Sequence, residues 1–339
     1  MKKDIESIIH DMVSKEAPNI CELTVMKEGN IILKDYWHGF KEDDALNVMS
    51  VTKGVVALLT GIAVDKGYIK SVDEKILSFF PEYECKRGEK TIQDVTVRHL
   101  LTMTAPYKYT SEPWKKVCTS PDWTQAALDL CGGKKGITGE FRYATLGIQI
   151  MNGIIENSTG QKVIDFANEY LFEPLGITAT VSHGESSKED QLDFVMNKNP
   201  RKHEWYCDPG GMVTAGWGLT LSATDMAKIG AVLACGGKTL DGNKVLSTDW
   251  IRDMTTPYQK MGEAFGNQAY GFLWWIPHGE EPEKGYNKEA VYAAIGDGGN
   301  VIYVDPVGKV SVGVAGTFKP RIFDRVEFIE TKILPKLLG

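Results

Sequence analysis

One stretch with a single charged residue constrains the fold of this chain most. Residues 51–64 read Val-Thr-Lys-Gly-Val-Val-Ala-Leu-Leu-Thr-Gly-Ile-Ala-Val. A helix that is apolar on every side must be buried on every side, so this stretch predicts a helix through the centre of a core. Gly67, which follows it, is the residue type favoured at a helix C-terminus. Ser50 stands at the other end, three residues before Lys53.

Ser50 and Lys53 are spaced so that they share one face of this helix. Burial disfavours a charged lysine and lowers its pKa, and a neutral lysine can take a proton from a serine hydroxyl. The N–H of Ser50 at the helix N-terminus is then available to an oxyanion. The alternative is that Ser50 only caps the helix while Lys53 extends to solvent. A Ser-x-x-Lys tetrad alone is expected about once by chance in such a chain.

Strand patterns occur at both ends of the chain. Residues 21–27 and 31–37, joined by Glu28-Gly29-Asn30, predict a hairpin because Gly29 and Asn30 tolerate positive φ. Near the C-terminus, strands are expected at residues 290–295, 300–304 and 310–316. Helices are expected at residues 4–15, 123–131, 145–158, 161–170, 222–235, 247–255 and 321–338.

This distribution favours an α/β fold of the α+β type. One antiparallel sheet is built from the N- and C-terminal segments and flanked by helices, and a large, mainly helical lobe is inserted. We expect residues 1–74 and 285–339 to form a discontinuous α/β domain, and residues 75–284 a mainly helical domain. The cleft between the two is the expected active site.

Composition limits the partners and the compartment. The 339 residues, 42% hydrophobic, suffice for a large core, and the net charge of −7 without long basic runs argues against nucleic acid and membrane partners. The first residues lack the apolar stretch of a secretory signal. The six cysteines and six histidines show no metal-ligand spacing. We expect a cytoplasmic protein with no metal or cofactor, acting on a small molecule or short peptide; the sequence does not specify the oligomeric state.

Six segments in order carry a family resemblance. They are residues 49–54, 97–104, 141–147, 172–177, 216–227 and 296–306. In these segments the chain resembles the serine β-lactamase and penicillin-binding-protein superfamily. It is most similar to the branch with class C β-lactamases, esterases, D-amino-acid-peptide hydrolases and 6-aminohexanoate-oligomer hydrolases. The resemblance implies a β-lactamase/transpeptidase-like fold and a serine hydrolase activity.

The resemblance implies three catalytic elements, of which two are matched in large part. Ser50 and Lys53 match Ser-x-x-Lys, and Tyr143 matches the tyrosine of Tyr-x-Asn. Thr145 replaces the asparagine, which keeps a hydroxyl group but loses the amide. In the implied mechanism Ser50 attacks a carbonyl carbon, and Lys53 and Tyr143 carry the proton to the leaving group. The sequence does not say which of the two is the proximate base.

The third element departs from the family pattern. By resemblance, Lys-Thr-Gly or His-x-Gly falls at Asp297-Gly298-Gly299. The family's cation helps to hold a substrate carboxylate, which an aspartate would repel. Neutral esters and amides, or substrates with an amine, are therefore expected rather than penicillin-type substrates. The glycines allow close backbone approach, and the N–H of Asn300 is predicted to join that of Ser50 as oxyanion donor.

Several aromatic residues follow or flank these segments. Tyr107 and Trp114 lie in the loop that borders the cleft in the family, where they wall the acyl pocket or pack in the core. Trp217, Trp274 and Trp275 are expected in the core.

The leading hypothesis is a serine hydrolase of small amides, esters or short peptides. A β-lactamase or a D-stereospecific peptidase is the alternative among enzymes. A catalytically silent relative that binds a ligand or scaffolds an assembly is the alternative from another class, motivated by the altered third element.

Overall fold

The computed structural model of the chain describes residues 2–184, 187–262, 268–278, 291–320 and 324–339. Its α-helices are α1 (Lys2–Glu16), α2 (Val51–Asp65), α3 (Val97–Leu101), α4 (Trp114–Cys118), α5 (Trp123–Leu130), α6 (Gln149–Thr159), α7 (Val163–Ala167), α8 (Lys188–Met196), α9 (Ala223–Ala234), α10 (Thr248–Met254), α11 (Arg325–Phe328) and α12 (Leu334–Leu338). Its strands are β1 (Ile20–Lys27), β2 (Asn30–Tyr36), β3 (Leu46–Asn47), β4 (Thr180–Ser182), β5 (Glu204–Tyr206), β6 (Thr220–Leu221), β7 (Gln259–Lys260), β8 (Ala269–Tyr270), β9 (Trp275–Ile276), β10 (Tyr292–Gly296), β11 (Asn300–Asp305) and β12 (Val310–Gly316).

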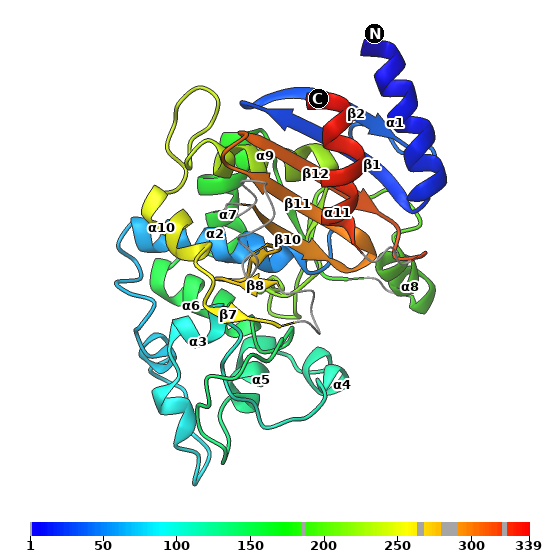
Figure 1. Cartoon of the computed structure of the whole chain (residues 1–339). Helices are drawn as coiled ribbons and strands as arrows, with labels where there is room; N and C mark the ends of the chain where they lie inside the picture. Colours follow the sequence, from blue (N-terminus) through cyan, green and yellow to red (C-terminus); the bar gives the residue numbers. More distant parts are fainter. Residues whose placement is uncertain (1, 185–186, 263–267, 279–290, 321–323) are drawn as a thin grey trace.

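A large antiparallel sheet joins the two ends of the chain (Figure 1). Its strand order is β2-β1-β12-β11-β10-β9-β8-β7. The N-terminal strand β1 pairs with the last strand β12, from Ile20 opposite Gly316 to Lys27 opposite Val310. The prediction of one antiparallel sheet built from both termini, flanked by helices, is confirmed.

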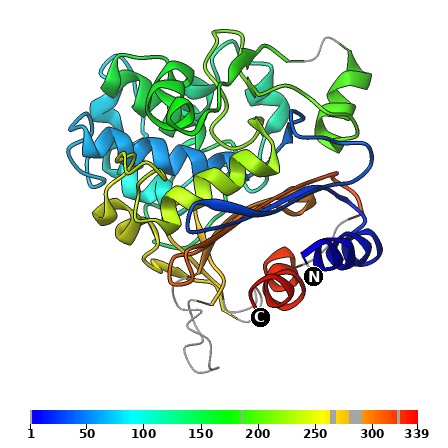
Figure 2. The ribbon, with the colours of Figure 1, turned by 90° about the horizontal axis from the view of Figure 1, so that it is seen from above.

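Helices cover both faces of the sheet (Figure 2). On one face lie α1 and the C-terminal helices, where Ile9 and Val13 belong to the same apolar cluster as Val326 and Ile329. On the other face α9 packs closely on the sheet. A Cβ atom at Gly313 would lie 1.9 Å from the carbonyl oxygen of Ala223, so only glycine permits this approach.

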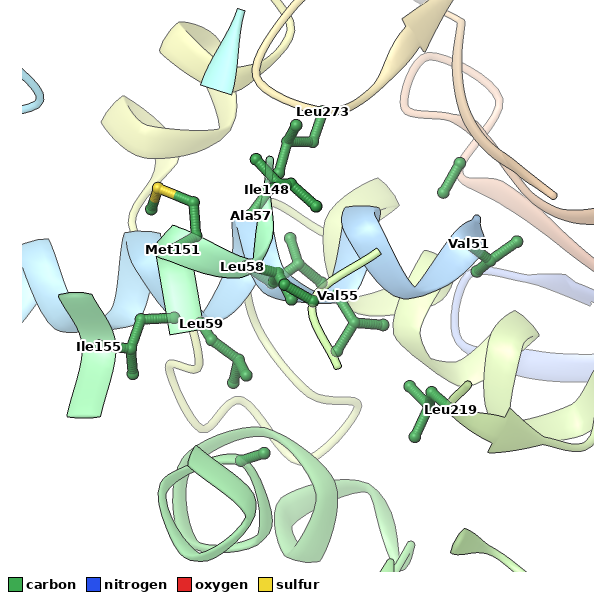
Figure 3. Close-up of a cluster of buried hydrophobic side chains, with 14 of the residues drawn as sticks. Val51, Val55, Ala57, Leu58, Leu59, Ile148, Met151, Ile155, Leu219 and Leu273 are labelled. Atoms are coloured by element: carbon green, nitrogen blue, oxygen red, sulfur yellow. The ribbon is translucent and has the colours of Figure 1, made fainter. Parts of the chain in front are cut away.

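Helix α2 runs through the main core, as its composition predicts. Every residue from Val51 to Ala63 is buried. Figure 3 shows its apolar side chains among those of α6 and of neighbouring loops, with Ile148, Met151 and Leu273 close by. Gly67 has a φ of 78° just beyond the end of the helix, as expected. Within the described part of the chain, no helix is both long and apolar enough to cross a membrane.

The structure corrects two expectations of local structure. Helix α6 begins at Gln149 and not at residue 145, because the preceding turn is held by a bond from the Leu146 N–H to Glu112 Oε1, 2.7 Å long. In the β1–β2 hairpin the positive φ values fall on Glu28 and Gly29 rather than on Gly29 and Asn30.

Part of the main sheet comes from residues 75–284, the range that we expected to be mainly helical. This range also supplies β7, β8 and β9, which form one edge of the main sheet. These strands have only two residues each, too few for an alternating pattern to reveal them. The domain division itself stays a prediction, and its boundary at residues 284/285 lies outside the described residues.

Candidate active site

Ser50 stands at the N-terminus of α2, with Lys53 one turn into the helix. The Ser50 side chain makes no capping hydrogen bond. Instead Lys53 Nζ donates to Ser50 Oγ at 3.0 Å. The Lys53 side chain has no exposed surface, whereas Ser50 is partly exposed. The interpretation of a capping serine with a solvated lysine is therefore wrong. A buried amine faces a serine hydroxyl that a substrate can reach.

The surroundings of Lys53 favour its neutral form. Nζ donates a second hydrogen bond to the carbonyl oxygen of Gly216, at 2.7 Å. Burial lowers the pKa of Lys53 to about 7, against the opposing influence of the Glu112 and Asp297 charges. About half of the Lys53 side chains are then neutral at pH 7, and a neutral amine has a lone pair that can accept a proton.

Tyr143 completes this group. Lys53 Nζ lies 4.8 Å from the centre of the Tyr143 ring, and the Ser50 hydroxyl lies within hydrogen-bonding reach of the phenol. Tyr143 is 37% exposed as a residue, yet desolvation of its phenol raises the pKa of Tyr143 well above its usual range. Trp275 stacks on the same ring with centroids 6.2 Å apart. Tyr143 is thus a neutral proton donor and acceptor beside Ser50.

The end of β10 packs against the N-terminus of α2. A Cβ atom at Gly296 would lie 2.3 Å from the Val48 carbonyl oxygen and 3.1 Å from the Ser50 nitrogen. Met49, between them, has a φ of 53°, a left-handed conformation that non-glycine residues seldom adopt. Only a residue without a side chain lets the strand come this close to Ser50, so Gly296 fixes the distance between β10 and Ser50.

Asn300 lies opposite Gly296 on β11 and is buried. Its side chain donates to the Asp297 carbonyl oxygen at 2.7 Å and accepts from the Gly316 N–H at 3.0 Å. Asn300 therefore fixes the turn between β10 and β11. It is Gly296 whose backbone reaches Ser50, and the role of Asn300 as an oxyanion donor stays a prediction.

The three residues of the predicted third element lie in this turn but differ in their surroundings. Asp297 is exposed, and its charge opposes the fall in the pKa of Lys53. Gly298 and Gly299 have φ values near 78°. A Cβ atom at Gly298 would meet Thr317, and one at Gly299 would meet Arg325. Of the three, Asp297 is the one whose charge acts on Lys53.

The other three predicted substrate-binding residues lie in different surroundings. Thr145 packs on Gly216, the residue that accepts from Lys53; a Cβ atom at Gly216 would lie 2.6 Å from the Thr145 carbonyl oxygen. Trp114 is 42% exposed and meets Trp217 edge to face, 6.1 Å between centroids. Tyr107 stacks on Tyr109, and its hydroxyl lies against Gly147. No described contact joins the Tyr107 side chain to Ser50.

Sequence reasoning missed three residues of this site. Gly216 contributes a backbone carbonyl, which leaves no signature in the residue type. Glu112 is an isolated acid in a loop, and nothing in its neighbours reveals that its charge acts on Lys53. Trp275 and Trp217 pack against core clusters as expected, although both are only half-buried. The stacking of Trp275 on Tyr143 is what sequence reasoning missed. Within the described residues, no three or more His, Cys, Asp or Glu side chains are grouped to bind a metal ion.

Comparison with known proteins gives one consistent result. The chain is 22% identical over 305 residues to a 6-aminohexanoate-dimer hydrolase of Paenarthrobacter ureafaciens, covering 83% of this chain and 68% of that protein. The structure is similar to that of a family VIII carboxylesterase, with a TM-score of 0.68, 19% identity and coverage of 97% and 96% of the two chains. It is also similar to a D-stereospecific amidohydrolase from Streptomyces sp., with a TM-score of 0.64, 15% identity and coverage of 92% and 94%. The beta-lactamase family model matches residues 21–327. The chain therefore belongs to the beta-lactamase family.

Proposed function

We propose that this protein is a serine hydrolase that cleaves small amides, esters or short peptides through an acyl-enzyme on Ser50. The observation that carries this proposal is the buried Lys53 amine, 3.0 Å from Ser50 Oγ, with a pKa of about 7. A serine hydroxyl is a weak nucleophile until a neighbouring base takes its proton. The relatives named above, which include a dimer hydrolase, a carboxylesterase and an amidohydrolase, support the same reaction class.

The geometry favours Lys53 as the proximate base. Neutral Lys53 accepts the Ser50 proton while Oγ forms a bond to the substrate carbonyl carbon. Tyr143, whose raised pKa keeps it protonated, gives its proton to the leaving amine or alcohol and is reprotonated from Lys53. The carbon–leaving-group bond breaks, and water then hydrolyses the acyl-enzyme by the reverse proton route. A phenolate base is disfavoured at neutral pH by the same raised pKa.

Two backbone N–H groups are proposed to stabilise the oxyanion. The first is that of Ser50, at the N-terminus of α2, where the helix dipole adds to its effect. The sequence predicts Asn300 as the second, but the contact between Gly296 and the Ser50 nitrogen favours the N–H of the next residue, Asp297. That N–H directly follows the strand end that borders Ser50.

The charges around Lys53 suggest the substrate class at the reacting centre. Glu112 and Asp297 both act on Lys53, and neither is a cation of the kind that holds the carboxylate of penicillin-type substrates. We therefore propose neutral esters and amides, or substrates with an amine next to the scissile bond, rather than β-lactams. Efficient turnover of a chromogenic cephalosporin would contradict this substrate class.

A fluorophosphonate probe tests the enzymatic function directly. Such probes react covalently with an activated serine. We expect one probe molecule per wild-type chain and none on the Ser50→Ala variant. Lys53→Met should fold normally and label far more slowly, because Ser50 then lacks its base. A folded wild-type protein that does not label at all would instead favour a catalytically silent relative.

A further inference from the structure

A second feature of the molecule is a groove of about 1180 Å³. Its walls are three loops, residues 86–91, 104–111 and 132–142, at the lower end of the molecule in Figure 1, far from the terminal helices. Seven lysines and arginines line it but only two glutamates, although the whole chain has a net charge of −7. The groove thus carries an excess of positive charge, whereas the chain as a whole carries an excess of negative charge.

Most of this positive charge is not neutralised by the protein itself. Lys86 pairs with Asp129 at 2.7 Å, and Lys108 pairs with the groove residue Glu89 at 3.1 Å. The remaining lysines and the exposed arginine have no ion pair within the described part of the chain; they are Arg87, Lys90, Lys134 and Lys135. A concave surface with one sign of charge attracts ligands of the opposite sign.

The groove and the Ser50 site share one chain segment. Arg142 lines the groove and is followed directly by Tyr143. The Arg142 guanidinium donates to the backbone carbonyl oxygens of Tyr107 (3.1 Å) and Tyr109, and lies 4.6 Å from the centre of the Tyr109 ring. The Arg142 side chain is therefore held by backbone carbonyls and an aromatic ring rather than by a carboxylate.

We propose that this groove binds the carboxylates of an acidic peptide whose amide bond is cleaved at Ser50. Its volume exceeds that of typical pockets for a single small molecule, about 300–1,000 Å³, which fits an extended chain. An acidic peptide combines repeated carboxylates with an amide for Ser50 to attack, whereas a polyphosphate offers no carbonyl carbon. Asp297 lies in a different loop, so the substrate is neutral or cationic at the reacting centre and anionic farther along. The cleavage part of this inference rests on the proposed function; the binding part does not.

Binding is measured with the Ser50→Ala variant, which cannot turn the peptide over. Fluorescein-labelled hexaglutamate is titrated with this protein, and fluorescence anisotropy gives the Kd at low and physiological salt. We expect saturable binding that weakens as salt rises. Adding Lys134→Glu and Lys135→Glu should raise the Kd on the order of tenfold, because exposed charge pairs contribute modestly and four charge units change. Arg87→Glu with Lys90→Glu is an independent pair on the opposite wall with the same expected result.

Lys238→Glu with Lys244→Glu is the matched control. These exposed lysines lie between α9 and α10, away from the groove, and give the same change in net charge (Figure 1). The control should leave the Kd unchanged. The proposal is overturned if the control pair raises the Kd as much as the groove pairs do, or if hexaglutamate does not bind. Tripolyphosphate that binds where hexaglutamate does not also overturns it.

Kinetics separate this inference from the proposed function. The wild-type protein is assayed with a neutral p-nitrophenyl ester and with p-nitroanilides of hexaglutamate and hexaglutamine that carry two glycines before the scissile bond, so that the reacting centre is neutral. We expect the groove variants to keep wild-type activity on the neutral ester and to lose about tenfold in kcat/KM on hexaglutamate only. Ester hydrolysis without any preference for hexaglutamate contradicts the groove proposal alone. Hexaglutamate binding without labelling of Ser50 by fluorophosphonate contradicts the proposed function alone.

Discussion

The protonation state of Lys53 should control the rate of acylation. Its pKa of about 7 leaves about half of the molecules with a neutral amine at pH 7, against about 1 in 3,000 for a lysine of pKa 10.5. The difference of about 3.5 pKa units corresponds to about 5 kcal/mol between the two protonation states. We expect kcat/KM for a neutral p-nitrophenyl ester to fall about tenfold per pH unit below pH 6 and to level off above pH 8.

The substitution Glu112→Gln tests the cause of this profile. The Glu112 charge is the larger of the two that oppose the fall in the pKa of Lys53. Glutamine keeps an acceptor for the Leu146 N–H, so the turn before α6 is retained. The midpoint of the profile should move to lower pH. Glu140→Gln removes an exposed acid that does not act on Lys53 and should leave the midpoint unchanged. A flat profile from pH 5.5 to 8.5, or a rise only above pH 9, would refute Lys53 as the base.

Three further predictions concern other parts of the structure. Tyr143→Phe should lower kcat about a hundredfold and leave the melting temperature nearly unchanged, because only the proton path is lost; a loss under threefold contradicts this role. Gly296→Ala should lower kcat by a similar factor, because its Cβ atom would meet the Val48 carbonyl oxygen at 2.3 Å and move β10 from Ser50; wild-type kcat would show that this distance is unimportant. Glu22 is buried, which raises its pKa to about 8 from 4.5. Between these values the unfolded chain releases the proton and the native protein keeps it, so stability falls as pH rises. Glu22→Gln should remove this loss, on the order of a few kcal/mol, and urea unfolding at pH 5 and pH 8 should show a smaller difference for the variant than for the wild type.

The sheet and the catalytic group were predictable because their signals are strong and local. An apolar helix that contains Lys53 favours burial of that lysine, and Ser50 three residues earlier lies on the same helical face. The strand patterns at both termini likewise predict one sheet, because an isolated two-stranded hairpin is at best marginally stable in water. These inferences need only the spacing of residues along one element.

The rest of the site depends on contacts between distant segments. The carbonyl of Gly216 and the charge of Glu112 reach Lys53 from other loops, and neither is marked by its own residue type. Gly296 matters because it lies against Val48 and Ser50. The family pattern instead predicted a role for the next two glycines, Gly298 and Gly299. Such contacts depend on how whole elements pack, which short motifs do not encode.

Rapid-quench mass spectrometry of the acyl-enzyme tests the central claim most directly. The wild-type protein is mixed with excess p-nitrophenyl acetate, quenched in acid within the first turnovers and digested. The account predicts an acetyl group on the peptide that contains Ser50, formed more slowly at pH 5.5 than at pH 8 and absent from Ser50→Ala. An acetyl group on a different residue, or turnover by Ser50→Ala at the wild-type rate, would contradict it.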